Sequence, residues 1–293
     1  MTLCGRASGL LTPQRLEISM SLRANAPRSI LAFLCALAGL ALSLAAPSAL
    51  AAGPSARQIM SEVEQTRKLD GSEAVVMMQM NDGKGHRRER KIAMATKLVD
   101  DGKTEKRIYR FLSPEDVKGT GILVFDYDTK ADDIWIYLPA LHKTRRILSS
   151  DRSKSFMGSD FSYGDLNIPP IDDYAYTLVK EELSGGEPCW VIDVFPKSAK
   201  IAEEEGYKKK TLWISKKTHT VRKGLYFDLD GKLKKSLSTG DVVLLDKKKG
   251  RYRAKRMEMK NVQTGTSSVF VTTDVKFVPN TKDEYFTTRY LER

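Results

Sequence analysis

Residues 121–148 read GILVFDYDTKADDIWIYLPALHKTRRIL. Residues 121–127 and 134–138 of this stretch are short runs rich in β-branched and aromatic side chains, the composition typical of strands. Residues 143–148 form a third run after a turn that contains proline. Connections this short join antiparallel neighbours, so the stretch predicts three consecutive strands of one antiparallel sheet.

The same pattern continues through most of the chain. Period-two segments recur from residue 74 to residue 277 and predict about ten or eleven strands. Residues 55–69 differ, because their apolar residues recur at helical spacing after Ser55, a favoured N-cap residue. A meander with this many hairpins must curl to bury its apolar face. We therefore expect a mainly β fold, a curled antiparallel sheet or unclosed β-barrel, with one N-terminal helix, a short lid helix and a hydrophobic cavity.

Several of the predicted strands are apolar on both faces. Residues 75–80 read VVMMQM, 122–125 read ILVF and 134–138 read IWIYL. An antiparallel sheet with one solvated face should alternate between apolar and polar residues, so a second layer must cover the other face. Either the N-terminal helix packs inside the curl, or the curl holds a lined cavity, partly plugged by helix and loop, that takes an acyl chain. The residues that we expect to line such a cavity are Val76, Met78, Met80, Leu123, Phe125, Trp135 and Tyr137.

The middle of the chain interrupts the rhythm of hairpins. Residues 149–174 read SSDRSKSFMGSDFSYGDLNIPPIDDY and show no strand pattern. Loops of this length in a compact domain are usually functional, so residues 149–173 are the candidate lid. Residues 159–166 could form a short helix capped by Ser159 or Asp160. Large apolar side chains in this segment should bury at the mouth of the curled sheet, namely Phe156, Met157, Phe161, Tyr163 and Leu166.

The N-terminal 51 residues read as a secretory signal peptide. Arg23 and Arg28 precede an apolar run at residues 30–46, and Ala49-Leu50-Ala51 forms an A-x-A cleavage site. Met20 is a more natural start, so residues 1–19 look like an upstream extension. Cleavage after Ala51 would leave one domain, residues 52–293, in the periplasm. The whole chain carries a net charge of +12, of which the removed part holds +3, so residues 52–293 would carry +9. For an exported protein this charge favours an anionic membrane surface, or no specific partner, over nucleic acid.

No catalytic or metal-binding pattern stands out in the sequence. The three histidines are far apart, and no paired cysteines or G-x-S-x-G motif occurs. Asp160 and Asp165 are close enough for acid–base chemistry only if buried together, and helix capping suits Asp160 better. Arg145 and Arg146 follow a strand and could meet lipid phosphates, although a solvated strand explains them as well. We expect a protein that is not an enzyme and has no cofactor, with Arg145, Arg146 and Asp160 at a polar mouth.

Three motifs carry a resemblance to a known family. WIYLPAL at 135–141, KTRRI at 143–147 and FMGSDFSYGDL at 156–166 resemble the outer-membrane lipoprotein-sorting protein family, a LolA-like group of periplasmic proteins. The likeness extends over the chain from residue 52 onward, although Gly164 stands where the family pattern has an acidic residue. The resemblance implies an unclosed β-barrel that holds a helix and a lipid-binding cavity. It also implies traffic to the outer membrane and a partnership with an RND-type exporter in the inner membrane.

The sequence is consistent with two classes of function. The first is a periplasmic carrier or acceptor of lipid or lipoprotein acyl chains. The alternative is an envelope protein that senses lipid and regulates a partner without transporting anything. A second domain would favour the sensor, and the sequence shows no linker that would separate one.

Overall fold

Residues 53–167 and 170–293 are described by the computed structural model of the chain, and Gly53–Arg293 form one compact unit. The predicted signal peptide, residues 1–51, and its cleavage site lie outside the described residues. Residues 168 and 169 of the candidate lid lie outside them too. No helix in the described ranges is long and apolar enough to cross a membrane.

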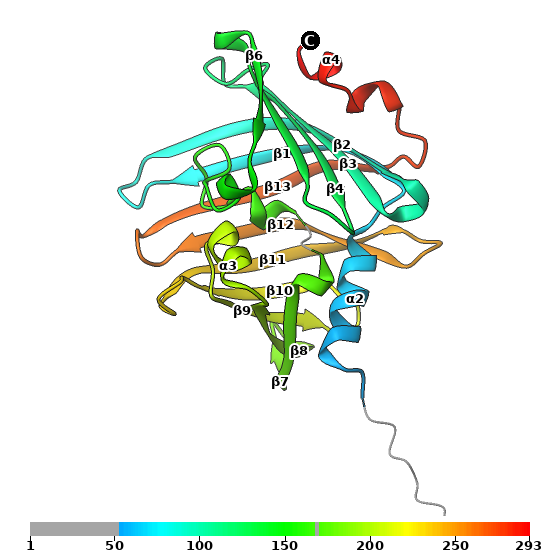
Figure 1. Cartoon of the computed structure of the whole chain (residues 1–293), viewed down its shortest axis with the longest axis vertical. Helices are drawn as coiled ribbons and strands as arrows, with labels where there is room; N and C mark the ends of the chain where they lie inside the picture. Colours follow the sequence, from blue (N-terminus) through cyan, green and yellow to red (C-terminus); the bar gives the residue numbers. More distant parts are fainter. Residues whose placement is uncertain (1–52, 168–169) are drawn as a thin grey trace, which may run out of the picture. The chain divides into compact units, whose positions relative to one another are not determined.

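The described residues form thirteen strands and three α-helices (Figure 1). The strands are β1 (Gly71–Asn81), β2 (Arg87–Val99), β3 (Thr104–Ser113), β4 (Gly121–Tyr127), β5 (Asp133–Leu138), β6 (Lys143–Ile147), β7 (Tyr174–Ser184), β8 (Glu187–Pro196), β9 (Lys209–Ser215), β10 (Val221–Phe227), β11 (Leu233–Asp246), β12 (Arg251–Asn261) and β13 (Thr266–Phe277). The helices are α2 (Ala56–Arg67), α3 (Ala199–Glu205) and α4 (Thr288–Leu291). Short 3-10 turns are η1 (Asp100–Gly102), η2 (Pro139–Leu141), η3 (Ser149–Asp151), η4 (Gly164–Leu166), η5 (Ile171–Asp173) and η6 (Asp283–Phe286).

All thirteen strands belong to one antiparallel sheet in the order β6-β5-β4-β3-β2-β1-β13-β12-β11-β10-β9-β8-β7. The sheet is two meanders joined where β1 pairs with β13. The predicted mainly β, curled and antiparallel architecture is confirmed, and the sheet remains open because its edge strands β6 and β7 do not pair. The chain between these edges, residues 148–173, must therefore cross from one end of the sheet to the other.

Helix α2 begins with the sequence signal that predicted it. The Ser55 hydroxyl accepts the Gln58 backbone N–H at 3.3 Å, and the Gln58 side chain accepts the Ser55 N–H at 2.8 Å. This reciprocal capping box satisfies two backbone donors at the helix start. Ile59 and Val63 then pack against the strands β7 to β10 in a cluster with Ala56, Tyr174, Trp190, Ile192, Val194, Leu212 and Ile214. The helix thus covers one half of the inner face of the sheet.

The C-terminal residues cover part of the opposite face. Phe286 of η6 and Leu291 of α4 are buried in a cluster with Ala95, Ile108 and Leu123 from β2, β3 and β4. Figure 1 shows this segment in red beside β2 to β4. Gly121 makes the contact close, because a Cβ atom there would lie 2.6 Å from Leu291 Cδ1. The outward-facing apolar residues of β4 are therefore covered by the chain itself.

Candidate functional site

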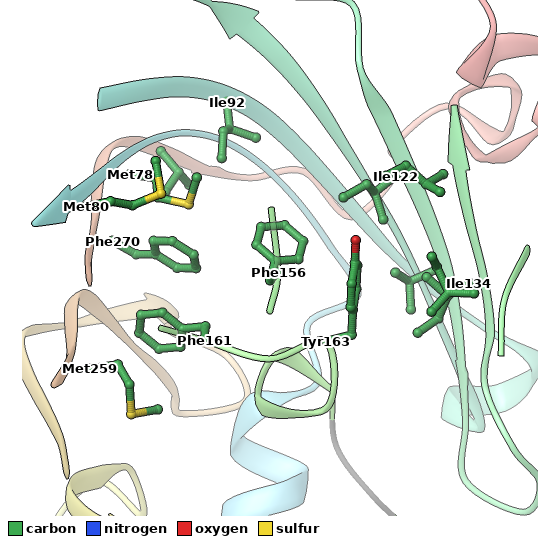
Figure 2. Close-up of a cluster of buried hydrophobic side chains, with 14 of the residues drawn as sticks. Met78, Met80, Ile92, Ile122, Ile134, Phe156, Phe161, Tyr163, Met259 and Phe270 are labelled. Carbon is green, nitrogen blue, oxygen red and sulfur yellow. The ribbon is translucent and has the colours of Figure 1, made fainter. Parts of the chain in front are cut away.

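The concave face carries the most extensive cluster of buried apolar side chains (Figure 2). Met78 on β1 and Met259 on β12 are fully buried there, and Phe270 on β13 lies between them in the sheet. Ile122 on β4 and Ile134 on β5 reach the same cluster from the other meander. Val76 and Met80, on the same face of β1 as Met78, also belong to it. The curl therefore brings residues from both halves of the chain to one apolar surface.

Residues 149–167, which we call the plug segment, occupy this surface. The Phe156 ring lies 5.9 Å from Tyr109, 6.2 Å from Phe270 and 5.6 Å from Tyr163, measured between ring centroids. Phe161 stacks on Phe270, and only 2% of the surface of Phe156 and of Phe161 is exposed. The space in which the sequence predicted a cavity is thus filled, in this structure, by side chains of the plug segment.

The topology explains why an irregular segment lies inside. The plug segment belongs to the connection between the two edge strands, so it crosses the opening of the curl. Its backbone makes few ladder contacts, since the structure pairs only Ser155 with Ser162 as an isolated bridge. Met157 and Gly158 adopt positive φ values of 51° and 79°, which turn the chain back toward the sheet. The segment is held by its side chains more than by backbone pairing.

Buried polar contacts fix the C-terminal end of the plug segment. Arg107 on β3 donates to the Leu166 carbonyl at 2.9 Å and to the Asn167 side-chain oxygen at 2.8 Å. The same guanidinium lies 2.6 Å from Asp126 on β4 and 3.4 Å from Glu105. Charge-assisted hydrogen bonds of this kind are the stronger ones, so Arg107 ties the plug segment to the sheet.

Asp165 anchors the same end of the segment to the other meander. Its Oδ2 atom accepts the Tyr207 hydroxyl at 3.0 Å and lies 3.2 Å from Lys235 Nζ on β11. Burial and the Asp165 charge raise the pKa of Tyr207 well above its usual range, so this hydroxyl stays a proton donor. Asp165 therefore serves as a structural anchor rather than as half of an acid–base pair.

A second buried ion pair joins the plug segment to α3. Arg152 lies 3.1 Å from Glu205, whose other oxygen lies 3.0 Å from Lys210 on β9. A Cβ atom on Gly164 would lie 3.1 Å from Glu205, so the residue with no side chain leaves room for this carboxylate. The Glu205 carboxylate therefore lies directly beside position 164. Sequence reasoning missed Arg107, Arg152 and Glu205, because alternating charged and apolar residues also suit an exposed strand or helix.

Four of the expected lining residues lie on the other face of the sheet. Leu123, Phe125, Trp135 and Tyr137 pack in the outer cluster with the C-terminal segment, not with the plug segment. Their neighbours Ile122, Val124, Ile134 and Ile136 face inward instead. Successive strand residues point to opposite faces of a sheet. An error of one residue in the inward-facing positions therefore assigns every side chain of the strand to the wrong face. The expectation that these four line the concave face is wrong.

The short lid helix expected over residues 159–166 does not form. Residues 159–166 contain only the 3-10 turn η4, Gly164–Leu166. Asp160 is not a helix cap, because its carboxylate accepts the Ser268 hydroxyl at 2.7 Å and the Thr266 hydroxyl, both on β13. Both carboxylate oxygens of Asp160 therefore bind hydroxyl groups of one strand, and neither caps a helix. Of the expected lid side chains, Phe156, Phe161 and Tyr163 are buried, and Met157 and Leu166 pack partly buried against the same cluster.

The three residues of the expected polar mouth do not form one group. Arg145 and Arg146 are exposed on the edge strand β6, and Arg146 pairs with Asp133 on β5. Asp160 is occupied by hydroxyl groups of β13, as described above. Arg146 pairs in register with Trp135 and Arg145 with Ile136, so the two arginines point to opposite faces. Only Arg145 is on the inward side of the strand.

Two hollows lie outside the concave cluster. One, of about 280 Å³, lies between the outer face and the C-terminal segment, with Ala93, Ile108, Tyr285 and Tyr290 among its lining residues. The other, of about 560 Å³, is mostly polar and lies near the end of α2, where Lys68, Asp128 and Arg251 are among the residues that line it. Neither is lined by the plug segment.

An open, curled antiparallel sheet with a helix on its inner face defines the class of LolA-like proteins. A LolA superfamily protein from Nitrosomonas europaea shares this fold, with a TM-score of 0.62 and 19% identity over 81% of this chain and 99% of that one. A DUF1329 family protein from Desulfovibrio piger has a TM-score of 0.74 and 28% identity over 80% of this chain and 97% of that one. The fold class is therefore shared across proteins of quite different sequence.

A further relative shows the family. An outer membrane lipoprotein-sorting protein domain from Vibrio parahaemolyticus is 30% identical, with a TM-score of 0.74 over 81% of this chain and 98% of that one. The chain belongs to the outer-membrane lipoprotein-sorting protein family. A family model described as "-like: Uncharacterized protein" matches residues 103–293. No curated protein matches the sequence.

Proposed function

We propose that the protein is a periplasmic carrier or acceptor of lipid or lipoprotein acyl chains, which bind the concave face in place of the plug segment. The observation that carries this proposal is the packing of Phe156, Phe161 and Tyr163 on that face. These side chains belong to a segment without regular backbone pairing, so they can leave the apolar surface without breaking the sheet. The relatives named for lipoprotein sorting and for the LolA superfamily support the same function.

The energies of exchange are of similar size. Burial contributes about 0.8 kcal/mol per methylene, or about 10 kcal/mol for a chain of twelve carbons. Each large apolar side chain that leaves the cluster loses about 1.5–3 kcal/mol, so three aromatic residues lose a comparable total. Near balance between the two states suits a carrier, because cargo that binds much more strongly than the plug segment would not be released.

The proposed cargo surface consists of the inward-facing residues that the plug segment covers. Val76, Met78 and Met80 on β1 form its centre, and Met157 and Leu166 would move with the plug segment. Flexible methionine side chains adapt to ligands of irregular shape, which favours lipid over one rigid ligand. Arg145, exposed at the inward side of β6, would meet the polar groups of a lipoprotein cargo at the rim.

The cellular setting is part of the proposal. Residues 1–51 would act as a signal peptide that is removed after Ala51, and residues 52–293 would function in the periplasm. Cargo would pass to or from an inner-membrane exporter, of the RND type that the family resemblance implies. The basic surface of the chain would help transient contact with anionic membranes.

A disulfide that locks the plug segment tests the mechanism. The Ser268 hydroxyl lies 2.7 Å from the Asp160 carboxylate, so the double variant Asp160→Cys/Ser268→Cys places two thiols in contact. We expect the oxidised variant to lose co-purifying lipid, as measured by mass spectrometry of organic extracts, and the reduced variant to regain it. The single variant Asp160→Cys, which lacks the same carboxylate but cannot form the lock, is the matched control.

The reduced and oxidised forms separate opening from folding. Both should give the same circular dichroism spectrum if the lock changes only the plug segment. Equal lipid content in a fully oxidised and a reduced sample would contradict displacement of the plug segment. Lipid absent from the unmodified protein as well would contradict the carrier function itself.

A further inference from the structure

A group of hydrogen-bond donors lies inside the curl, beside the last turn of α2. Arg67 is the last residue of that helix, and its guanidinium makes no hydrogen bond or ion pair within residues 53–167 and 170–293. Its guanidinium lies within electrostatic range of Tyr109 on β3 and of Tyr226 on β10. These strands are far apart in the order of the sheet, so only its curl brings the three side chains together.

A second arginine reaches the same place from β12. Arg253 donates to the Thr66 carbonyl at 2.7 Å, which satisfies a carbonyl near the end of α2 and places the guanidinium beside Arg67. The structure gives Arg253 no carboxylate partner among the described residues. Burial and the neighbouring cations Arg67, Arg251 and Arg107 lower the pKa of Arg253 to about 10, although Glu105 opposes this.

The nearby carboxylates are already engaged by a third arginine. Arg107 lies 2.6 Å from Asp126 and 3.4 Å from Glu105, while its buried Nε–H has no acceptor within the described ranges. Asp132 also lies within electrostatic range of Arg107 but is 3.8 Å from Arg152, so Arg67 and Arg253 have no carboxylate of their own among the described residues. The Tyr109 and Tyr226 hydroxyls add donors for which the described residues supply no acceptor. The group has an excess of positive charge and of N–H and O–H donors.

This arrangement of charges does not stabilise the fold. Arg67 and Arg253 are partly buried, and guanidinium groups that are removed from water are normally paired with carboxylates, because burying a charge without a partner costs free energy. Charges kept in such a place are candidates for a functional site. The apolar surface begins directly beside it, since the Tyr109 ring lies 5.9 Å from the Phe156 ring of the plug segment. A ligand that fits both surfaces has an anionic end and a hydrocarbon tail.

We propose that Arg67, aided by Arg253 and by the Tyr109 and Tyr226 hydroxyls, binds the anionic head group of an amphiphile whose tail lies on the concave apolar face. The inference rests on the proposed carrier function and narrows it to ligands that end in a carboxylate or phosphate. Arginine suits this role, because its planar fork donates two hydrogen bonds to either anion.

Matched ligands that differ only in charge test the proposal. Dodecanoate and 1-dodecanol have equal tails, so their dissociation constants, measured by calorimetric titration of the purified protein at neutral pH, isolate the head group. We expect the unmodified protein to prefer dodecanoate and Arg67→Gln to bind it about tenfold more weakly, with dodecanol unchanged. Arg67→Lys keeps the charge and should recover part of the loss. Arg256→Gln, on the exposed side of β12, is the control and should bind both ligands as the parent does.

Thermal unfolding provides a second measurement. We expect Arg67→Gln to be at least as stable as the parent without ligand, because an unpaired charge has been removed from the interior. A clear loss of stability would show that Arg67 supports the fold and would overturn the head-group role. Equal weakening of dodecanoate and dodecanol would overturn it in the same way.

The remaining outcomes separate this inference from the function on which it rests. Equal affinity of the unmodified protein for the acid and the alcohol overturns the head-group site and leaves the carrier function standing. Binding of neither amphiphile overturns both. Saturable binding of inorganic phosphate that depends on Arg67, in a protein that binds neither amphiphile, identifies a free anion as the ligand and overturns the lipid assignment.

Discussion

The ring of Phe161 in the plug segment stacks on the ring of Phe270 in β13, with centroids 4.5 Å apart and planes inclined by 16°. Both side chains are buried. Strand β13 pairs with β1 at the junction of the two meanders, so the stack joins the plug segment to the middle of the sheet rather than to an edge. This contact has to break before the concave face can accept another apolar group.

Removing the Phe161 ring should make the concave face easier to load. A Phe→Ala change in a core costs about 3 kcal/mol, and here much of that loss falls on the closed position of the plug segment. Apparent affinity is the intrinsic affinity reduced by the fraction of open protein, so Phe161→Ala should bind dodecanoate at least about tenfold more tightly. Calorimetric titration measures the change. Phe195→Ala, at a partly exposed position on β8, should leave it unaltered. Weaker binding by a folded Phe161→Ala protein would mean that the ring holds the cargo instead of competing with it.

Asp132 gives stability an unusual dependence on pH. Burial, and next the charge of Asp126, raise its pKa from 3.8 to about 6, although Arg152, Arg107 and a 2.8 Å hydrogen bond from Asn167 oppose the rise. The folded protein thus binds this proton more tightly than the unfolded chain. The free energy of unfolding is therefore higher when Asp132 is protonated, and this contribution is lost as the pH rises from about 4 to about 6.

Asp132→Asn tests this linkage. The variant cannot titrate, so it should gain stability relative to the parent as the pH rises through that window, with the difference smallest near pH 4. Urea unfolding at a series of pH values measures it. Asp82→Asn is the control, because the pKa of this exposed carboxyl is lowered by its hydrogen bond with His86 and the difference should have the opposite sign. A constant gap between parent and Asp132→Asn across the series would refute the assignment.

Gly121 is expected to be indispensable to the outer layer. Its Cβ atom would lie 2.6 Å from Leu291 Cδ1 and 3.1 Å from the Leu291 carbonyl oxygen. Gly121→Ala should therefore lower the free energy of unfolding by about 1–3 kcal/mol through overpacking. Gly240→Ala is the matched control in another strand, since the nearest atom to its Cβ is 3.9 Å away. Chemical denaturation compares the two, and equal stability of both variants would show that the C-terminal segment yields without strain.

Arg107 should control how firmly the plug segment is held. Arg107→Met removes the bonds to Leu166 and Asn167 and the ion pair with Asp126, and breaking a buried ion pair usually costs about 3–5 kcal/mol. We expect faster limited proteolysis between residues 149 and 167 and a lower unfolding midpoint. Arg57→Gln breaks an exposed pair with Asp172 and should change stability by less than about 1 kcal/mol. Proteolysis of Arg107→Met at the parent rate would argue that the aromatic contacts alone hold the segment.

Much of the fold could be predicted because it depends on local signals. Ser55 and Gln58 mark the start of α2, and short turns between apolar runs require antiparallel neighbours. The plug segment was recognisable for the same reason, since residues 149–174 lack either periodicity. The buried positions of Phe156, Phe161 and Tyr163 followed from their size in an otherwise polar segment.

The site was harder to predict, because its contacts join distant parts of the chain. Arg107 meets Asn167, and Asp165 meets Lys235, across separations in sequence that no local pattern encodes. The same limit applies to Asp160, which resembles a helix cap in the sequence but binds hydroxyl groups on β13. In the sequence, charged residues that alternate with apolar ones predict a solvated strand face. The curl of the sheet places some of these charged residues inside instead.

By itself, the sequence determined that β4 and β5 would be apolar on both faces and that something would have to cover each face. It did not determine which alternate set faces inward, because shifting a period-two pattern by one residue leaves the pattern unchanged. Only the tertiary structure decided that Ile122 and Ile134 meet the plug segment while Leu123 and Trp135 meet the C-terminal residues. The direction of the curl and the pairing of β1 with β13 make that choice, and both arise from contacts between segments far apart in the chain.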